Sequence, residues 1–266
     1  MENGLKIAIV GAGRVAWNLA PALQDCGAEV IEVWSKSRTS AETLAKQIGC
    51  RYSWGTVDVV TCEADLYLIA VKDAVLPDVI RRLHVGREQA LMAHTAGSMP
   101  LSLFAEAGHG RGGVFYPMQT FSKERAVDFT KVHFFIEASN EEDAELLTDL
   151  ACALTDDEAF VHPSTSASRR QLHLAAVFAC NFVNHCCTLA DDVLADAGLD
   201  FSVLLPLVDE TVAKLHQLPP VEAQTGPAVR HDENVMGVHR SMLVGKPDLQ
   251  EIYSLLSQSI QRYDKL

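Results

Sequence analysis

The sequence predicts an α/β fold in which a doubly wound, Rossmann-type sheet is followed by an all-α domain. In the first 163 residues, short apolar runs alternate with helical patterns, as they do in parallel sheets that carry helices on both faces. From Ser166 onward the pattern is helical to the C-terminus. We therefore expect two domains, residues 1–163 and residues 164–266.

The turn after the first predicted strand, Lys6–Val10, carries the clearest motif. Its residues have the spacing GxGxxA in Gly11-Ala12-Gly13-Arg14-Val15-Ala16. The first glycine permits a tight turn, the second lets backbone approach a pyrophosphate, and the third small residue lets helix and strand pack closely. The following helix directs free N–H groups and its positive end at an anion. The motif predicts a dinucleotide site formed by Gly11, Ala12, Gly13, Arg14 and Val15; the alternative is a purely structural turn.

The helical pattern after this turn runs from Val15 to Cys26, with Gly27 as the expected cap. It contains Pro21. A proline inside a helix removes one backbone hydrogen bond, so we expect the second half to be kinked or shortened. The second strand is predicted at Glu29–Trp34.

The residues after the second strand favour NADP over NAD. An NAD site usually carries an acid about twenty residues past the glycines, where it accepts hydrogen bonds from the ribose 2′-hydroxyl. Here that place holds Ser35, Lys36, Ser37 and Arg38, and the nearest acid, Glu32, lies inside the strand. Two cations and several hydroxyls would bind a 2′-phosphate by charge-assisted hydrogen bonds. The alternative is that Lys36 and Arg38 are solvated loop charges.

The other elements follow from the same patterns. Helices are predicted at Ser40–Ile48 (opened by a Ser40 cap), Asp78–Leu83 and Glu141–Leu154, and strands at Cys50–Tyr52, Asp65–Val71, Ala90–His94, Gly113–Tyr116, Val132–Ala138 and Ala159–His162. Ligands of open α/β sheets bind outside the carboxyl ends of the strands. The turns after the fourth and fifth strands therefore add Ala70, Val71, Lys72, Thr95 and Ala96 to the expected cofactor site.

Composition and charge argue against several classes of protein. A formal net charge of −13 does not suit a general nucleic-acid or anionic-membrane surface. No stretch approaches the unbroken apolar length of a membrane span, and the N-terminus runs into a strand without a signal-peptide pattern. We therefore expect a cytoplasmic protein that binds neither nucleic acid nor membrane.

Cysteine and histidine spacings predict no disulfide framework and no metal site. The seven cysteines are odd in number and lack CxxC spacing. The adjacent pair Cys186 and Cys187 is expected to pack in the core; the alternative is a redox-active pair. His231 and His239 have no third partner in a ligand pattern. A serine nucleophile elbow is also missing from the sequence.

Longer segments resemble a known family. The path from the glycine turn through WSKSR, DLYLIAVKD and HTAGS resembles the 6-phosphogluconate dehydrogenase-like superfamily, which includes pyrroline-5-carboxylate reductase. Phe115–Ser122, Gln171–His185 and Thr225–Asp232 look like a family of NADP oxidoreductases in which a Rossmann-like domain precedes a helical domain of unknown function. The resemblance covers nearly the whole chain. It implies two domains, NADP binding and a helical domain of the kind that commonly mediates dimers, but no substrate.

The first long helix of the second domain often carries a catalytic Lys and Asn in that superfamily. This chain has no lysine there and offers instead His173, Asn181, Asn184 and His185. At about 100° per residue, Asn184 lies about 20° and Asn181 about 80° from the direction of His173, which predicts a polar stripe on an otherwise apolar helix; cofactor and substrate would supply its partners. We expect His173 to transfer a proton and Asn181 to orient the substrate. The alternatives are a hydrogen-bonded core histidine and an amide that pins two helices.

Further candidates lie at strand ends and in the family's second-domain motif. His94 and Thr95 close the fifth strand, where superfamily members place groups near the nicotinamide, and His94 is either an acid/base or a supporting residue. Tyr116 and Gln119 are expected to line the substrate pocket, together with Thr225. Arg230 is placed to clamp a substrate carboxylate, or else to pair with a neighbouring acid.

Together these patterns predict an NADP-dependent oxidoreductase that acts on an unidentified small molecule by hydride transfer. We expect a homodimer formed through the helical domain, with the last helix, Leu249–Tyr263, packing into that domain or into a partner subunit. One alternative is an imine reductase of the pyrroline-5-carboxylate reductase type, although TGPAVR departs from that enzyme's glycine- and threonine-rich helix start. Another is an NADP-binding sensor without turnover, because the helix lacks the lysine.

Overall fold

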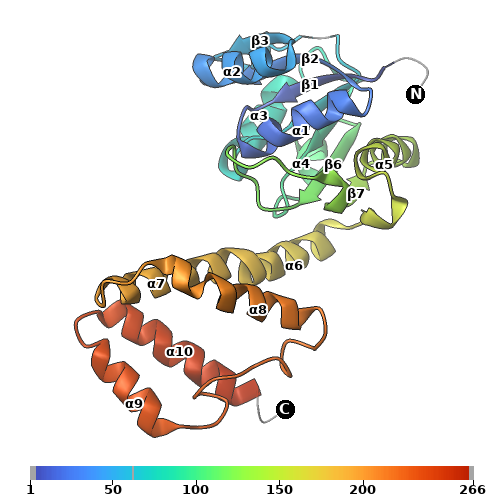
Figure 1. Cartoon of the computed structure of the whole chain (residues 1–266). Helices are drawn as coiled ribbons and strands as arrows, with labels where there is room; N and C mark the ends of the chain where they lie inside the picture. The colour runs from blue at the N-terminus through green and yellow to red at the C-terminus, as the bar shows by residue number, and fades with distance from the viewer. Residues whose placement is uncertain (1–3, 62, 264–266) are drawn as a thin grey trace. The chain divides into compact units, whose positions relative to one another are not determined.

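The computed structural model describes residues 4–61 and 63–263 (Figure 1). The chain divides into two compact units, Met1–Cys180 and Asn181–Leu266. This division falls inside a helical segment, because the beginning of that segment packs against the sheet of the first unit. The boundary after residue 163, which follows the change in secondary structure, stays a prediction.

A single sheet of eight strands forms the centre of the first unit, in the order β3-β2-β1-β4-β5-β6-β7-β8. The strands from β3 to β6 are parallel, β7 is antiparallel to β6, and β8 is parallel to β7. Their bounds are β1 Lys6–Val10, β2 Glu29–Ser35, β3 Arg51–Trp54, β4 Leu66–Ile69, β5 Leu91–His94, β6 Gly112–Met118, β7 His133–Ala138 and β8 Val161–Pro163. The carboxyl ends of β1 to β6 therefore share one edge of the sheet.

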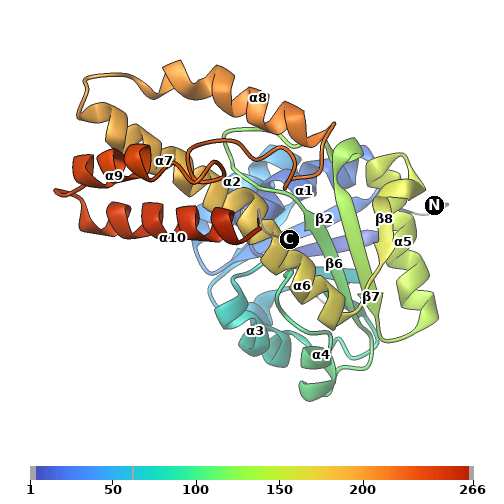
Figure 2. The ribbon, with the colours of Figure 1, turned by 90° about the horizontal axis from the view of Figure 1, so that it is seen from below.

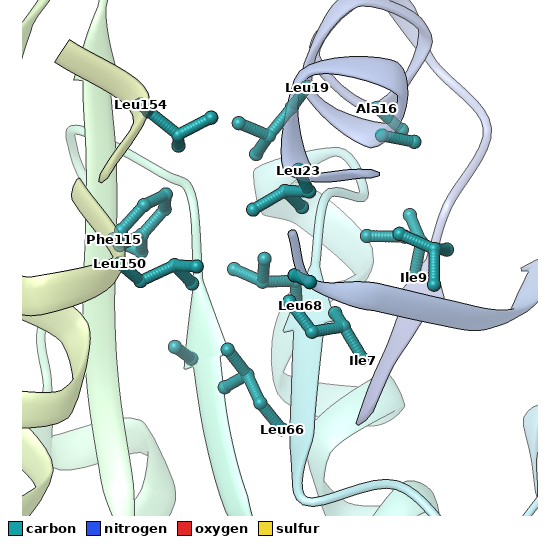
Figure 3. Packing of buried hydrophobic residues seen from close by; sticks show 14 of the residues in the cluster. Ile7, Ile9, Ala16, Leu19, Leu23, Leu66, Leu68, Phe115, Leu150 and Leu154 are labelled. Atoms are coloured by element: carbon teal, nitrogen blue, oxygen red, sulfur yellow. The ribbon is translucent and has the colours of Figure 1, made fainter. Parts of the chain in front are cut away.

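Helices cover both faces of this sheet, as the α/β prediction requires (Figure 2). Successive side chains of a strand point to opposite faces, so Ile7 and Ile9 of β1 pack under one layer of helices and Ala8 and Val10 under the other. Figure 3 shows Ile7, Ile9 and Leu68 opposite Leu19 and Leu23. The first layer is α1 (Arg14–Asp25), α2 (Arg38–Ile48) and α5 (Glu141–Thr155); the second is α3 (Leu76–Leu83) and α4 (Ser102–Glu106).

Helix α1 continues through Pro21 to Asp25, so the expected shortening is wrong. Leu19 and Leu23, which lie on either side of the proline, are both buried in the core. Burial of such side chains contributes about 1.5–3 kcal/mol each, enough to offset much of the cost of a proline in a helix.

Helix α2 begins at Arg38 rather than Ser40 because Ser37 is its cap: the Ser37 hydroxyl accepts a hydrogen bond from the Ser40 N–H at 3.4 Å. This makes Arg38 the first helical residue rather than a loop residue. The other predicted strands and helices are present, with ends displaced by a few residues.

The long helical segment after β8 is interrupted once. It consists of α6 (Ser166–Ala176), a π-helical turn η5 (Val177–Phe182) and α7 (Val183–Ala195). The thirty residues 166–195 have a mean hydropathy of 1.3 in their most apolar part, and are long and apolar enough to cross a membrane by length and composition. The expectation that no stretch approaches that length was therefore wrong, although one such helix is weak support for a membrane protein.

The π-turn also overturns the predicted polar stripe. A π-turn has more residues per turn than an α-helix, so the directions of Asn181 and Asn184 relative to His173 cannot be counted at a constant angle. His173 is half-buried, whereas Asn181, Asn184 and His185 are exposed. The polar residues thus do not form one buried row within this chain.

The second unit is helical, as predicted. Its elements after η5 are α7, η6 (Phe201–Leu204), α8 (Leu205–Leu215), α9 (Glu233–Met242) and α10 (Pro247–Tyr263). Lys246, before α10, forms ion pairs with Asp192 of α7 at 3.1 Å and with Asp196, the C-cap of that helix, at 2.8 Å. His239 of α9 lies 2.9 Å from the hydroxyl of Tyr253 on α10. These polar contacts connect its helices.

Large apolar side chains of the second unit remain mostly exposed. Among the described residues of this unit, Ala228 and Met236 are its buried apolar residues. On the last helix, Leu255, Leu256 and Tyr263 are exposed, so the described residues of this unit do not cover them.

Cys186 and Cys187 do not follow the expected core packing, whereas Cys26 and Cys50 are half-buried and pack against the core of the first unit. The six cysteines that the structure describes are free, and Cys186 is exposed while Cys187 is half-buried. Cys62 lies outside the described residues.

Candidate cofactor and active site

The two glycines of the first turn have different surroundings. Gly11 adopts φ +121°, and its N–H donates to the carbonyl of Trp34 at 2.8 Å. A Cβ on Gly11 would lie 2.4 Å from the carbonyl oxygen of Ala70, in the turn after β4. Around Gly13, by contrast, the nearest atom to an added Cβ is that same oxygen at 3.9 Å. At Gly11 the two turns therefore pack too closely for a side chain, whereas at Gly13 a Cβ would fit at ordinary van der Waals distance from its neighbour.

The N-terminus of α1 suits an anion. Gly13 is the N-cap, makes no side-chain cap hydrogen bond, and is followed by a first turn without acidic residues. The first N–H groups of a helix have no partner within the helix, and the helix dipole makes this end positive. A dinucleotide pyrophosphate fits this end on both grounds.

The residues after β2 fit the 2′-phosphate of NADP. Lys36 and Arg38 are exposed at the start of α2. Glu32, the nearest acid, is buried and occupied: its carboxylate accepts hydrogen bonds from the Ser53 hydroxyl and, at 2.9 Å, from the Thr61 N–H. This carboxylate therefore does not face the position of a ribose at the strand end.

The turns after β1, β4 and β5 meet at one edge, as the parallel order predicts. The N–H of Ala70 donates to the Val10 carbonyl at 2.8 Å, and the N–H of Thr95 donates to the Ile69 carbonyl at 3.1 Å. Thr95 is buried and Ala96 half-buried. The predicted cofactor residues thus come from neighbouring strand ends, which is the arrangement that a dinucleotide needs.

Tyr116 of β6 and His173 of α6 form a contact beside these turns. The phenol oxygen of Tyr116 lies 3.1 Å from Nδ1 of His173, and the two rings meet edge to face with centroids 6.1 Å apart. A Cβ on Gly97 would lie 2.7 Å from both side chains, so the turn after β5 touches the pair directly. Burial raises the pKa of the Tyr116 phenol, and the nearby charge of Arg169 partly offsets the rise.

Arg169 and Glu137 hold α6 in this position. Arg169 is completely buried, pairs with Glu137 of β7 and donates to the Met99 carbonyl. The Ser166 hydroxyl donates to the same carboxylate at 2.9 Å. His173 lies one helical turn after Arg169, so the ion pair fixes the histidine beside Tyr116. We did not predict this pair; the acid within the apolar strand His133–Ala138 was its one signal in the sequence.

His94 is placed to support the turn rather than to exchange protons. It is fully buried, stacks on Phe104 with centroids 5.7 Å apart, and accepts a hydrogen bond at Nδ1 from the Ala96 N–H at 3.2 Å. Burial, helped by the charge of Arg169, lowers the pKa of His94 to about 3. The ring is therefore neutral at physiological pH, which favours the supporting role over the acid/base role.

Gln119 lies in a loop that α1 holds in place. Its side-chain oxygen accepts a hydrogen bond from the Thr120 N–H at 2.8 Å. Asn18 of α1 donates to the Ser122 carbonyl at 2.7 Å and accepts from the Val127 N–H at 3.2 Å. The loop borders a polar cavity of about 300 Å³. Gln119 is thus held just after the end of strand β6.

Three predicted residues lie on the second unit. Asn181, in the π-turn, and Thr225 and Arg230, in the loop before α9, are all exposed. Asp232 is engaged as the cap of α9, where its carboxylate accepts from the Val235 N–H at 3.1 Å. Of the predicted catalytic and substrate residues, Tyr116 and His173 are thus in direct contact. The roles of Asn181, Thr225 and Arg230 stay predictions.

Comparison with known proteins identifies the family. Residues 1–112 match a Rossmann-like domain, and residues 132–260 match a domain of unknown function, DUF2520. A candidate NADP oxidoreductase of Bacteroides fragilis, whose crystal structure is known, is 45% identical over 97% of this chain and 98% of that chain, with a TM-score of 0.92. The chain belongs to this family of two-domain proteins with a Rossmann-like domain followed by DUF2520.

More distant structures share the fold. A protein of Thermotoga maritima is 18% identical over 98% of this chain and 100% of that chain, with a TM-score of 0.78. The pyrroline carboxylate reductase of Plasmodium falciparum, solved with NADP bound, is 11% identical over 98% of each chain, with a TM-score of 0.60. Among curated proteins no match was found.

The contrast between the two glycines predicts separable effects. Gly11→Ala should destabilise the protein by at least about 2 kcal/mol, because the new Cβ meets a backbone carbonyl in a positive-φ conformation. Gly13→Ala should cost no more than about 1 kcal/mol, because its backbone is extended and a Cβ fits beside Ala70, so that only the poorer helix N-cap remains as a cost. Denaturant unfolding of both variants measures this difference; equal stabilities would contradict the assigned packing role of Gly11.

Proposed function

We propose that the protein is an NADP-dependent oxidoreductase that transfers a hydride to or from a small molecule. The observation that carries the proposal is the uncapped N-terminus of α1 above Gly13, which lies at the same sheet edge as the cations after β2. The 45% identical candidate NADP oxidoreductase supports the same activity. When bound, the nicotinamide cofactor supplies or accepts the hydride.

The residues proposed to hold NADP come from four strand ends. The backbone of Gly11, Ala12, Gly13, Arg14 and Val15 would receive the pyrophosphate, and Ser35, Lys36, Ser37 and Arg38 the 2′-phosphate. Ala70, Val71, Lys72, Thr95 and Ala96 would border the rest of the cofactor.

His173 is the proposed proton-transfer residue. If Nδ1 donates its proton to the Tyr116 hydroxyl oxygen, the other ring nitrogen, Nε2, carries a lone pair in the neutral ring and a proton in the imidazolium; the described residues offer Nε2 no hydrogen-bond partner. The imidazolium can then give the Nε2 proton to a substrate oxygen or nitrogen, and the neutral ring can accept a proton in the reverse direction, while Tyr116 fixes the orientation of the ring. His94 would support the turn. Asn181, Gln119, Thr225 and Arg230 are proposed to orient or bind the substrate.

Turnover with a substrate panel tests the proposed function. Purified protein is mixed with NADPH and with imines, 2-ketoacids or other carbonyl compounds, or with NADP and β-hydroxyacids, and the cofactor absorbance is followed. We expect oxidation or reduction of the cofactor with one compound class. Turnover of cyclic imines would select the imine reductase alternative, whose fold this chain shares. Tight NADPH binding without any turnover would favour the sensor, and failure to bind NADPH would refute the proposal.

His173→Ala should lower kcat about 100-fold at unchanged NADPH affinity, because it removes proton transfer and leaves the cofactor residues intact. Tyr116→Phe should lower kcat less, since it removes the orienting hydrogen bond only. Gln171→Ala, an exposed neighbour on α6, is the matched control. Steady-state kinetics on the active substrate measure these effects; a full-rate His173→Ala enzyme would exclude the histidine from proton transfer.

We also propose a homodimer formed by the second unit. Its exposed large apolar residues include Leu199, Val203, Leu205, Leu207, Val212, Leu215, Val235, Val238, Met242, Val244, Leu255 and Leu256. Extensive apolar surface of this kind marks an interaction site. A second copy of the chain would also cover the exposed Leu255, Leu256 and Tyr263 of α10. A cytoplasmic location without membrane or nucleic-acid partners stays a prediction from composition.

Sedimentation of surface variants checks the dimer. Leu207→Asp and Met242→Asp place a charge on side chains that are 64% and 72% exposed, and they should shift the protein from dimer to monomer. Val85→Asp, at a 64% exposed residue of the first unit, should leave the dimer intact. A monomeric wild-type protein, or variants that stay dimeric, would contradict the assignment.

A further inference from the structure

Trp54 ends strand β3 with its ring largely outside the core. In the sheet register it lies beside Ser35, the last residue of β2, at the edge proposed for the cofactor. Tyr52, two residues earlier on the same face, packs against the core, whereas Trp54 remains 46% exposed. An indole left open at the carboxyl edge is therefore next to the segment Ser35–Arg38.

The chain around Trp54 is fixed by backbone and side-chain hydrogen bonds. Gly55 adopts φ +89° and donates its N–H to the Ser35 carbonyl at 3.3 Å. The indole N–H of Trp34 donates to the Thr56 carbonyl at 3.2 Å. The end of β3 and the turn after it are thus tied to the end of β2, and the position of the Trp54 ring follows from these ties.

The guanidinium of Arg38 stacks on this ring. Its Cζ lies 4.8 Å from the centroid of the Trp54 ring. A guanidinium that rests on an aromatic face keeps its N–H groups directed outward along its edge, where they can bind phosphate oxygens. The stack therefore holds Arg38 at the cofactor edge with its donors unobstructed.

Glu42, the ion-pair partner of Arg38, leaves the guanidinium N–H groups free to bind a ligand. Glu42 lies 3.7 Å from Nε, beyond hydrogen-bond distance, and Lys46 binds the same carboxylate at 2.7 Å. Among the described residues, no hydrogen bond to the Arg38 guanidinium is formed. Trp54 is thus the neighbour that orients it.

We propose that Trp54 is a specificity-determining residue that selects NADP over NAD by holding Arg38 toward the 2′-phosphate. The proposal rests on the proposed NADP-dependent function and adds a residue from a third strand to the site. Trp54 acts through Arg38 and is a positioning residue. It should therefore matter for ligands that carry the 2′-phosphate and not for those that lack it.

Binding of NADPH, NADH, 2′,5′-ADP and 5′-AMP to the full chain tests the proposal by calorimetry. Trp54→Ala should weaken NADPH and 2′,5′-ADP about three- to tenfold and leave NADH and 5′-AMP within about twofold. Trp54→Phe, which keeps an aromatic face, should retain most of the affinity. In an Arg38→Ala background, Trp54→Ala should have no further effect on NADPH, because the residue that it orients is gone.

The controls separate this proposal from the function itself. Val59→Ala removes another exposed apolar side chain near β3 and should leave all four affinities unchanged. Thermal unfolding checks that each variant is folded. Wild-type protein that binds no NADPH would refute the proposed function. Wild-type binding that Trp54→Ala leaves unchanged, or equal losses for NADPH and NADH, would overturn the role of Trp54 alone.

Discussion

The candidate active site depends on the buried ion pair between Arg169 and Glu137. Removing a guanidinium from water costs several kcal/mol, and here a carboxylate and the Met99 carbonyl compensate for that loss. We infer that such a pair contributes less to net stability than to a single docking position for α6. If the helix slid along the sheet by one turn, the charge would be left buried without its partner. The contact between Tyr116 and His173 follows from this constraint.

Much of the fold was predictable because its signals are local. The glycine turn, the apolar strands and the helix starts each depend on a few adjacent residues, and the parallel order then brings the strand ends together. Even so, helix α1 continues past Pro21, because core packing by Leu19 and Leu23 outweighs a local rule. Arg38 is a helical residue and not, as predicted, a loop residue, because Ser37 and not Ser40 is the N-cap of α2.

The chemistry was less predictable because it depends on contacts between distant segments. Arg169 and Glu137 are 32 residues apart, and nothing in their immediate surroundings pairs them. The π-turn at Val177–Phe182 breaks the constant angle on which the predicted polar stripe depended. His173 was predicted to transfer a proton from its residue type, which stays a prediction, and its contact partner Tyr116 was predicted only as a pocket residue. Periodicity also showed which helices are amphipathic without showing that the second unit leaves its apolar side chains exposed.

Strand β2 contributes both to the folding of the sheet and to ligand binding, and it does so through different residues. The hydrogen bonds that the buried Glu32 carboxylate accepts from Ser53 and Thr61 belong to the interior of the sheet, whereas the side chain at Ser35 belongs to the ligand edge. Glu32 therefore cannot be recruited to bind a ribose hydroxyl without leaving two interior donors without an acceptor. A change of cofactor preference during evolution would have to act at the strand end, so it can occur by surface substitutions that leave the folding of the domain intact.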